Sequence, residues 1–163
     1  PTEFAIAETF EIWMVDEDAI VDSPRGADLR EMARPTARLH HQIRIGDAVC
    51  AYARSSRNAA RGLLRSLTFS PLASAVDGGI DWLDAHVRGA FTIRVLRVPA
   101  GALVALWVVP RDRRRASRAL VVAAPRGSRL PRNRLLAAAD LLDSLRRALT
   151  RNRKPVTPPS QES

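Results

Sequence analysis

Hydrophobic and polar residues alternate along several stretches of the chain, which is the pattern of β-strands with one buried face. Phe10, Ile12 and Met14 recur at every second position and lead into a run of acids, so a strand over residues 10–15 should end in a polar loop. Residues 43–53 carry two further apolar runs around a Gly-Asp pair. Either two strands joined by a tight turn or one bent strand with a bulge fits this region.

The middle of the chain carries the clearest strand pattern. Every second residue from Phe91 to Val95 is apolar, residues 99–101 favour a turn, and residues 103–109 are almost continuously apolar. An uninterrupted apolar strand is typical of one that is buried on both faces. We therefore expect a hairpin whose second strand is central in the sheet, followed by another strand over residues 119–124.

Apolar residues spaced three or four positions apart predict the helices. A final helix over residues 133–150 has the most regular spacing. Ser70 followed by Pro71 is typical of a helix start, and the Asp77-Gly78-Gly79 sequence of a helix end. Further helical stretches are expected over residues 28–39 with a break or kink at Pro35, after a cap at Ser55 or Ser56 as far as Leu67, and over residues 80–87.

Together these elements predict an α+β fold, a single compact domain in which helices pack on a largely antiparallel sheet. The domain is expected to span residues 1–150 and to be followed by a flexible, basic and Pro-rich tail over residues 151–163. The longest apolar run, residues 100–109, is shorter than the ~20 residues that cross a bilayer, so no membrane span is expected. The first ten residues contain two acids and no base, which is unlike a secretory signal, and the expected location is cytoplasmic.

Charge is distributed unevenly along the sequence. The chain has 26 Lys and Arg against 17 Asp and Glu, a net charge of +9, and all but one of the bases are arginine. The first 50 residues hold ten acids and five arginines, whereas the remaining residues hold seven acids and 21 bases. This asymmetry favours either a basic face that binds an anionic partner or head-to-tail association between copies. A GC-rich coding sequence would also raise the number of arginines without any function.

The strongest functional candidate is a group of arginines between two predicted strands. A loop can present several guanidinium groups together, and such groups bind the phosphates of nucleic acids or the carboxylates of an acidic protein. No aromatic residues accompany them for base stacking. The group consists of Arg111, Arg113, Arg114, Arg115 and Arg118, with an extension expected toward Arg126, Arg129, Arg132 and Arg134. The alternative interpretation is a hairpin tip that is merely solvated.

Carboxylates and histidines offer an enzymatic alternative. Asp16, Asp18 and Asp22 follow directly on a predicted strand, where oxygen ligands can hold a divalent metal ion, although neighbouring residues on an extended chain point to opposite sides. His40 and His41 are adjacent and do not have the spacing that chelates one metal, so one packed and one exposed imidazole are expected. No phosphate loop, dinucleotide-binding fingerprint or zinc-binding cysteine set occurs, and no cofactor is expected.

These observations favour a non-enzymatic interaction module whose basic face binds an acidic protein surface or nucleic acid, within a larger assembly or as a homo-oligomer. The binding residues on this hypothesis are the five arginines between the predicted strands. The alternative is a hydrolase or transferase with a carboxylate-centred site, with or without a divalent metal, near Asp16, Asp18 and Asp22.

Overall fold

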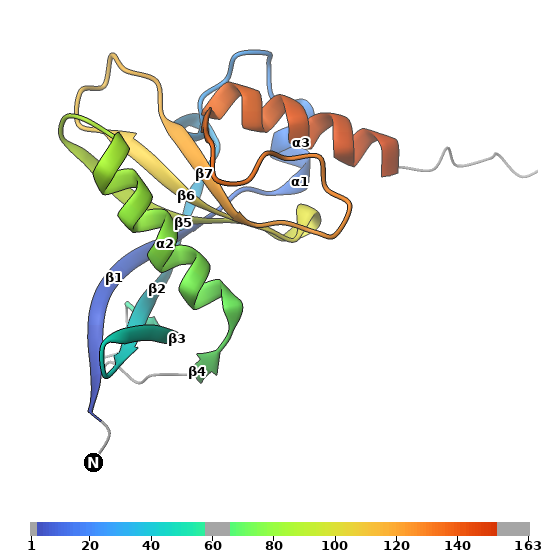
Figure 1. Ribbon diagram of the computed structural model, residues 1–163. Helices are drawn as coiled ribbons and strands as arrows, with labels where there is room; N and C mark the ends of the chain where they lie inside the picture. Colours follow the sequence, from blue (N-terminus) through green and yellow to red (C-terminus); the bar gives the residue numbers. More distant parts are fainter. Residues whose placement is uncertain (1–2, 58–65, 153–163) are drawn as a thin grey trace, which may run out of the picture.

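All strands that the structure describes belong to one twisted sheet (Figure 1). The structure is a computed structural model and describes residues 3–57 and 66–152. The strand order is β4-β3-β2-β1-β5-β6-β7-β8, and every neighbouring pair is antiparallel except β1 and β5, which are parallel. The strands are β1 (Phe4–Met14), β2 (Arg34–Ile45), β3 (Ala48–Ser56), β4 (Ser66–Phe69), β5 (Phe91–Val98), β6 (Leu103–Pro110), β7 (Arg118–Ala123) and β8 (Leu135–Ala137).

Helices pack on both faces of this sheet, so the predicted α+β domain with a largely antiparallel sheet is confirmed (Figure 1). One face carries α2 (Pro71–His86), and the other carries α1 (Glu17–Asp22) and α3 (Ala138–Asn152). Two short 3-10 turns, η1 (Leu29–Glu31) and η2 (Pro99–Gly101), complete the described elements. The sheet therefore separates the two largest hydrophobic cores of the described residues.

Strand β6 contributes to both cores, as its continuous apolar sequence predicts. Ala105 and Trp107 lie in the core beneath α1 and α3, while Val104 and Leu106 lie in the core beneath α2. Both Leu106 and Trp107 have no exposed surface. The predicted hairpin of β5 and β6 is also confirmed, and η2 forms its turn.

The Gly-Gly pair that resembles a helix end lies inside α2, so the predicted stop is wrong. The helix begins as expected, with Pro71 in its first turn and the Ser70 hydroxyl accepting a hydrogen bond from the Leu72 amide. It then continues through Gly79, where a Cβ atom would lie 2.8 Å from the Cδ1 atom of Leu106. Gly79 therefore serves close packing of the helix on β6 rather than helix termination.

Residues 28–39 are not the predicted helix. They form only the 3-10 turn η1 and the beginning of β2, with Pro35 paired to Trp13 near the start of that strand. A bulge follows in which Ala37 has a positive φ of 56°. The hydroxyl of Thr36 donates to the Ile12 carbonyl across this bulge, so strand pairing outweighs the local helical pattern.

Other boundaries also differ from the sequence analysis. Residues 43–53 form two strands joined by a tight turn, one of the two alternatives. Ser55 and Ser56 end β3, Leu67 belongs to β4, and the intervening part of the expected helix lies outside the described residues. The final helix begins at Ala138 rather than residue 133, and it includes the first two residues assigned to the tail, residues 151 and 152. Residues 153–163 lie outside the described part of the chain.

Trp107 is the largest fully buried side chain, and its removal tests the central position of β6. We expect Trp107→Ala to lower the free energy of unfolding by about 3–5 kcal/mol, because it leaves a large cavity. Trp107→Phe should lower it less, because the ring against Trp13 is kept and the indole N–H, which has no partner among the described residues, is removed. Chemical denaturation measures both changes. An unchanged midpoint for the alanine variant would contradict the buried position.

Candidate functional site

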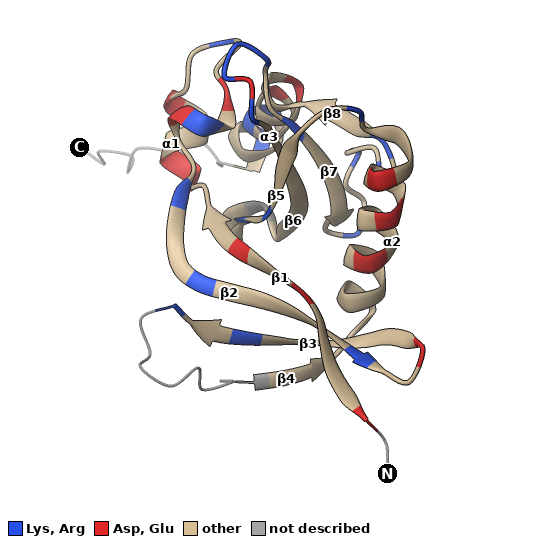
Figure 2. Cartoon of the chain, turned by 90° about the vertical axis from the view of Figure 1, so that its left-hand side faces the viewer, with Lys and Arg blue, Asp and Glu red and all other residues tan. Residues whose placement is uncertain are grey.

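The five arginines predicted as a binding group lie on the β6–β7 loop (residues 111–117) and the first residue of β7. Arg111, Arg113, Arg114 and Arg115 are exposed, and Arg118 is half-buried in the strand. None of the five forms an ion pair with another described residue. The structure therefore presents these positive charges to solvent at one end of the sheet (Figure 2).

The backbone of this loop is fastened to η1 through Asp28. Its carboxylate accepts hydrogen bonds from the Ser117 hydroxyl at 2.6 Å and the Ser117 amide at 2.8 Å. It also accepts from the Arg30 amide and guanidinium. Burial alone would raise the pKa of Asp28, but the hydrogen bonds from Arg30 and Ser117 outweigh it and lower that pKa.

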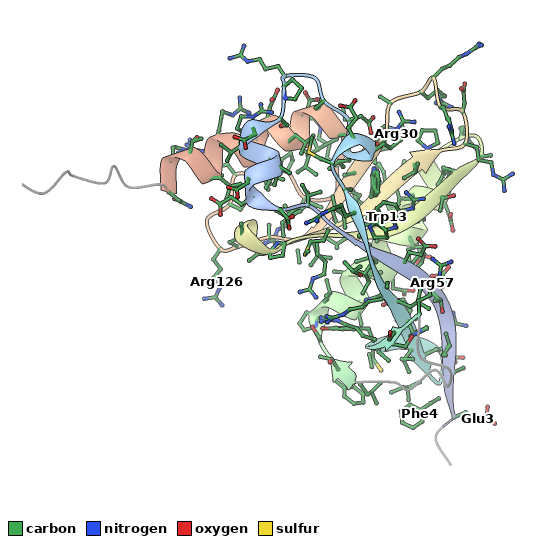
Figure 3. The ribbon with its side chains drawn as sticks, turned by 180° about the vertical axis from the view of Figure 1, so that it is seen from behind. Glu3, Phe4, Trp13, Arg30, Arg57 and Arg126 are labelled. Atoms are coloured by element: carbon green, nitrogen blue, oxygen red, sulfur yellow. The ribbon has the colours of Figure 1, made fainter. Side chains whose placement is uncertain are left out.

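Arg30 itself reaches from η1 to the loop (Figure 3). Its guanidinium donates to the carbonyls of Arg113, at 3.3 Å, and Arg115, at 2.8 Å. The loop backbone is thus held in place while the arginine side chains extend from it. No local sequence pattern marks Asp28 or Arg30, because 83 to 89 residues separate them from their loop partners.

The expected extension toward Arg126 and Arg129 is not continuous with the loop. Arg126 and Arg129 follow β7, whereas the loop precedes it. The first and last residues of this six-residue strand are about 17 Å apart. Arg126 and Arg129 instead line a separate groove with Arg147 and Arg151 of α3. Figure 3 shows Arg126 far from Arg30.

A second group of arginines, which the sequence analysis missed, lines a hollow of about 630 Å³ where β1, β2, β3 and β5 meet. Its cationic residues are Arg34, Arg38, Arg54 and Arg97, and its apolar wall includes Ile12, Met14, Pro35 and Pro99. We call it the arginine hollow. Because its arginines come from three strands and are separated by up to 63 positions, no local motif could reveal it.

Strand pairing explains how these arginines meet on one face. Arg38 pairs with Ile12, and Arg97 pairs with Met14 on the other side of β1. Ile12 and Met14 are two positions apart on β1, so their side chains and those of their partners point to the same face. Arg54 lies opposite His40, two residues from Arg38, and so shares this face. It is the face that α2 covers farther along the sheet.

The arginine hollow holds charges that the described residues leave unneutralised. Arg34 pairs with Asp16 at its rim, but Arg38, Arg54 and Arg97 form no ion pair with any other described residue. Arg54 donates to the Tyr52 hydroxyl at 3.2 Å. Burial, with the nearby charges of Arg54 and Arg38, lowers the pKa of Arg97 although Tyr52 acts in the opposite direction. The positive charges of Arg38 and Arg54 therefore repel that of Arg97.

Both histidines are buried, so the expectation of one exposed imidazole is wrong. His40 contacts the side-chain amide oxygen Oε1 of Gln42 through Nε2 at 2.8 Å and stacks on Tyr52, and the side-chain amide Nε2 of Gln42 donates to the backbone carbonyl of Ala73 in α2. His41 points to the other face, between the hydroxyls of Thr9 and Ser55. Burial lowers the pKa of both imidazoles, and their hydrogen bonds link strands and helix rather than forming an exposed site.

The acidic group forms a helix rather than the expected loop. Asp16 precedes α1 and pairs with Arg34, while Asp18 and Asp22 lie at the two ends of this short helix. Within residues 3–57 and 66–152, no three His, Cys, Asp or Glu side chains are arranged to hold a metal ion. Nor does any helix in these ranges have the length and apolarity needed to cross a membrane.

The chain was compared with protein-family models, curated proteins and solved structures, and none of them matches it. The two arginine sites are therefore the features from which a function is inferred.

Asp28 allows a test of how the loop is held. We expect Asp28→Asn to lower the free energy of unfolding by about 1.5–3 kcal/mol, because hydrogen bonds to a charged, largely buried acceptor are lost or weakened. Amide exchange at Ser117 should become faster, since its N–H loses the carboxylate. Asp112→Asn is the control, because the Asp112 side chain is exposed and, among the described residues, its carboxylate accepts a hydrogen bond from the Arg114 amide alone. Equal effects of the two substitutions would contradict the role given to Asp28.

The buried histidines predict a pH dependence of stability. Their pKa values are lower in the folded protein than the ordinary 6.5, so the unfolded chain binds protons more readily. The free energy of unfolding should therefore fall as the pH drops below about 6.5. Replacing both His40 and His41 with glutamine should flatten this dependence, whatever it does to stability at neutral pH. The control is His86→Gln, which removes an exposed imidazole, and an unflattened curve for the double variant would refute the assignment.

Proposed function

We propose that the chain is a non-enzymatic interaction module that binds the phosphate backbone of nucleic acid through the β6–β7 loop. The observation that supports this is a loop whose backbone is tied to η1 while its arginine side chains are unpaired with described carboxylates. Fixing the loop in advance reduces the entropy lost on binding. Four exposed guanidinium groups within five residues suit a closely spaced row of phosphates.

The loop's composition favours recognition without sequence preference. Residues 111–117 contain no aromatic side chain on which a base can stack. The arginines are at a hairpin tip rather than on a helix or ribbon shaped for the major groove. Contacts to phosphate oxygens position a nucleic acid but carry no sequence information.

An acidic protein surface is the second candidate, because carboxylates also bind guanidinium groups in paired hydrogen bonds. The enzymatic alternative near Asp16, Asp18 and Asp22 has no comparable support. Asp16 is paired with Arg34, and Asp18 and Asp22 are on α1 without an arrangement for metal binding among the described residues.

Salt dependence of binding to a short duplex tests the proposal. If all five arginines contact phosphates, log K should fall with log salt with a slope near −4.5, from about −0.9 per phosphate. Replacing Arg113, Arg114 and Arg115 with glutamine should reduce the magnitude of the slope by about 3 and weaken binding to all sequences alike. Fluorescence anisotropy over a salt series measures both quantities.

A control variant distinguishes the contribution of the loop arginines to binding from that of the protein's net charge. Replacing Arg126, Arg129 and Arg151 with glutamine removes the same charge from exposed positions at the other groove. It should change the slope far less. Equal effects of the two triple variants would mean that net charge, not the loop, attracts nucleic acid. If the wild type binds poly-glutamate but no duplex at ~50 mM salt, where counterion release favours binding, the partner is an acidic protein instead.

A further inference from the structure

The arginine hollow has the size and lining of a small-molecule site. Its volume of about 630 Å³ lies within the roughly 300–1,000 Å³ typical of ligand pockets. Of its arginines, Arg54 and Arg97 are half-buried and Arg38 is exposed. Ile12 and Met14 contribute an apolar surface between them.

Three guanidinium groups converge here without a described carboxylate to neutralise them. Arg97, on β5, interacts electrostatically with both Arg54 and Arg38, which belong to β3 and β2. Holding like charges together in a partly buried hollow is unfavourable unless an anion joins them. The sheet itself imposes the arrangement, because the three residues occupy same-face positions on strands whose register is set by backbone pairing.

The charge and shape of this lining distinguish among anions. A carboxylate has two oxygens and one charge, whereas a phosphate monoester has three free oxygens and up to two charges, so it can accept from three guanidinium groups at once. The lining of the hollow is not made of arginines alone, because Pro35 and Pro99 add to the apolar wall that Ile12 and Met14 begin. An organic group attached to the phosphate would contact this wall.

We propose that the arginine hollow binds a small organic phosphate monoester, with the phosphoryl group held by Arg38, Arg54 and Arg97 and the organic group against Ile12, Met14, Pro35 and Pro99. This site is separate from the β6–β7 loop. The hollow lies beside Arg97 and Pro99 at the η2 end of the β5–β6 hairpin, whereas the loop follows β6 at the other end. The proposal therefore does not depend on nucleic-acid binding.

Calorimetric titration with phenyl phosphate, inorganic phosphate and benzoate tests each part of the proposal. Phenyl phosphate should bind most tightly, because it offers both the phosphoryl group and an apolar ring. Inorganic phosphate should bind more weakly, since it lacks the ring. Equal binding of inorganic phosphate would overturn the role of the apolar wall, equal binding of benzoate would overturn the preference for phosphate, and no binding of phenyl phosphate would overturn the site.

Substitutions of the arginines then test whether phenyl phosphate binds in the hollow. Arg97→Gln should weaken phenyl phosphate binding about 10- to 100-fold, the usual loss for a hydrogen bond to a charged group. It should not lower the thermal midpoint of the unliganded protein, because it removes like-charge repulsion. Arg38→Gln provides a second variant at an exposed position, where packing is little affected. A similar loss is expected.

Two controls make the result specific. Arg88→Gln removes an exposed arginine beyond α2, away from the hollow, and should leave phenyl phosphate binding unchanged. The loop variant with Arg113, Arg114 and Arg115 replaced should also bind phenyl phosphate normally, even if it no longer binds a duplex. If Arg88→Gln weakens binding as much as Arg38→Gln does, or if neither hollow variant weakens it, the assignment to the hollow is wrong.

Discussion

The parallel pairing of β1 with β5 is the contact on which the rest of the structure depends. It consists of three residue pairs, Ile12 with Val95, Trp13 with Leu96 and Met14 with Arg97, and the Val15 amide extends it by donating to the Arg97 carbonyl at 3.1 Å. On one side of it, β1 to β4 form an antiparallel meander, and on the other side β5 to β8 form a second one. This short joint turns two antiparallel halves into one eight-stranded sheet.

The β1–β5 pairing also brings together the arginine contacts on each face of the sheet. On one face it places Arg97 beside Arg38 and Arg54, which come from the other half. On the opposite face it places Trp13 edge-to-face against Trp107, with the Arg94 guanidinium 4.1 Å and 5.1 Å from their ring centroids. A cation over two aromatic rings is stabilised without a carboxylate. In the hollow, Arg54 has such a contact with the Tyr52 ring, 5.4 Å from its centroid, but no aromatic ring of the described residues lies in this way against Arg38 or Arg97. The β1–β5 pairing thus gives one face an arginine held by two aromatic rings, and the other face three arginines that no described carboxylate neutralises.

The acidic first part of the sequence and the basic remainder do not form separate acidic and basic regions among the described residues of the folded protein. Glu8, from the acidic half, lies near Asp77 and Asp81 of α2, from the basic half, and burial together with these acids raises its pKa. Arg38, also from the acidic half, meets Arg54 and Arg97. Long-range pairing of β1 and β2 with later elements mixes the halves, so within residues 3–57 and 66–152 the charges do not separate into one acidic and one basic end (Figure 2). Three separate groups of described arginines lie instead at the β6–β7 loop, in the hollow and along the groove beside α3.

The sequence by itself determined the α+β class, the β5–β6 hairpin, the burial of Trp107 and the position of the β6–β7 loop, because each depends on a contiguous apolar or polar pattern. It did not determine whether residues 34–45 form a strand, why Gly79 stands inside a helix, or which arginines meet. Tertiary structure decided these, since β1 supplies the partner for β2, Leu106 supplies the surface that excludes a side chain at Gly79, and three strands supply the hollow. The physical reason is the same in each case: local pattern specifies which face of a segment is apolar, but only packing against distant residues specifies what that face and its polar neighbours contact.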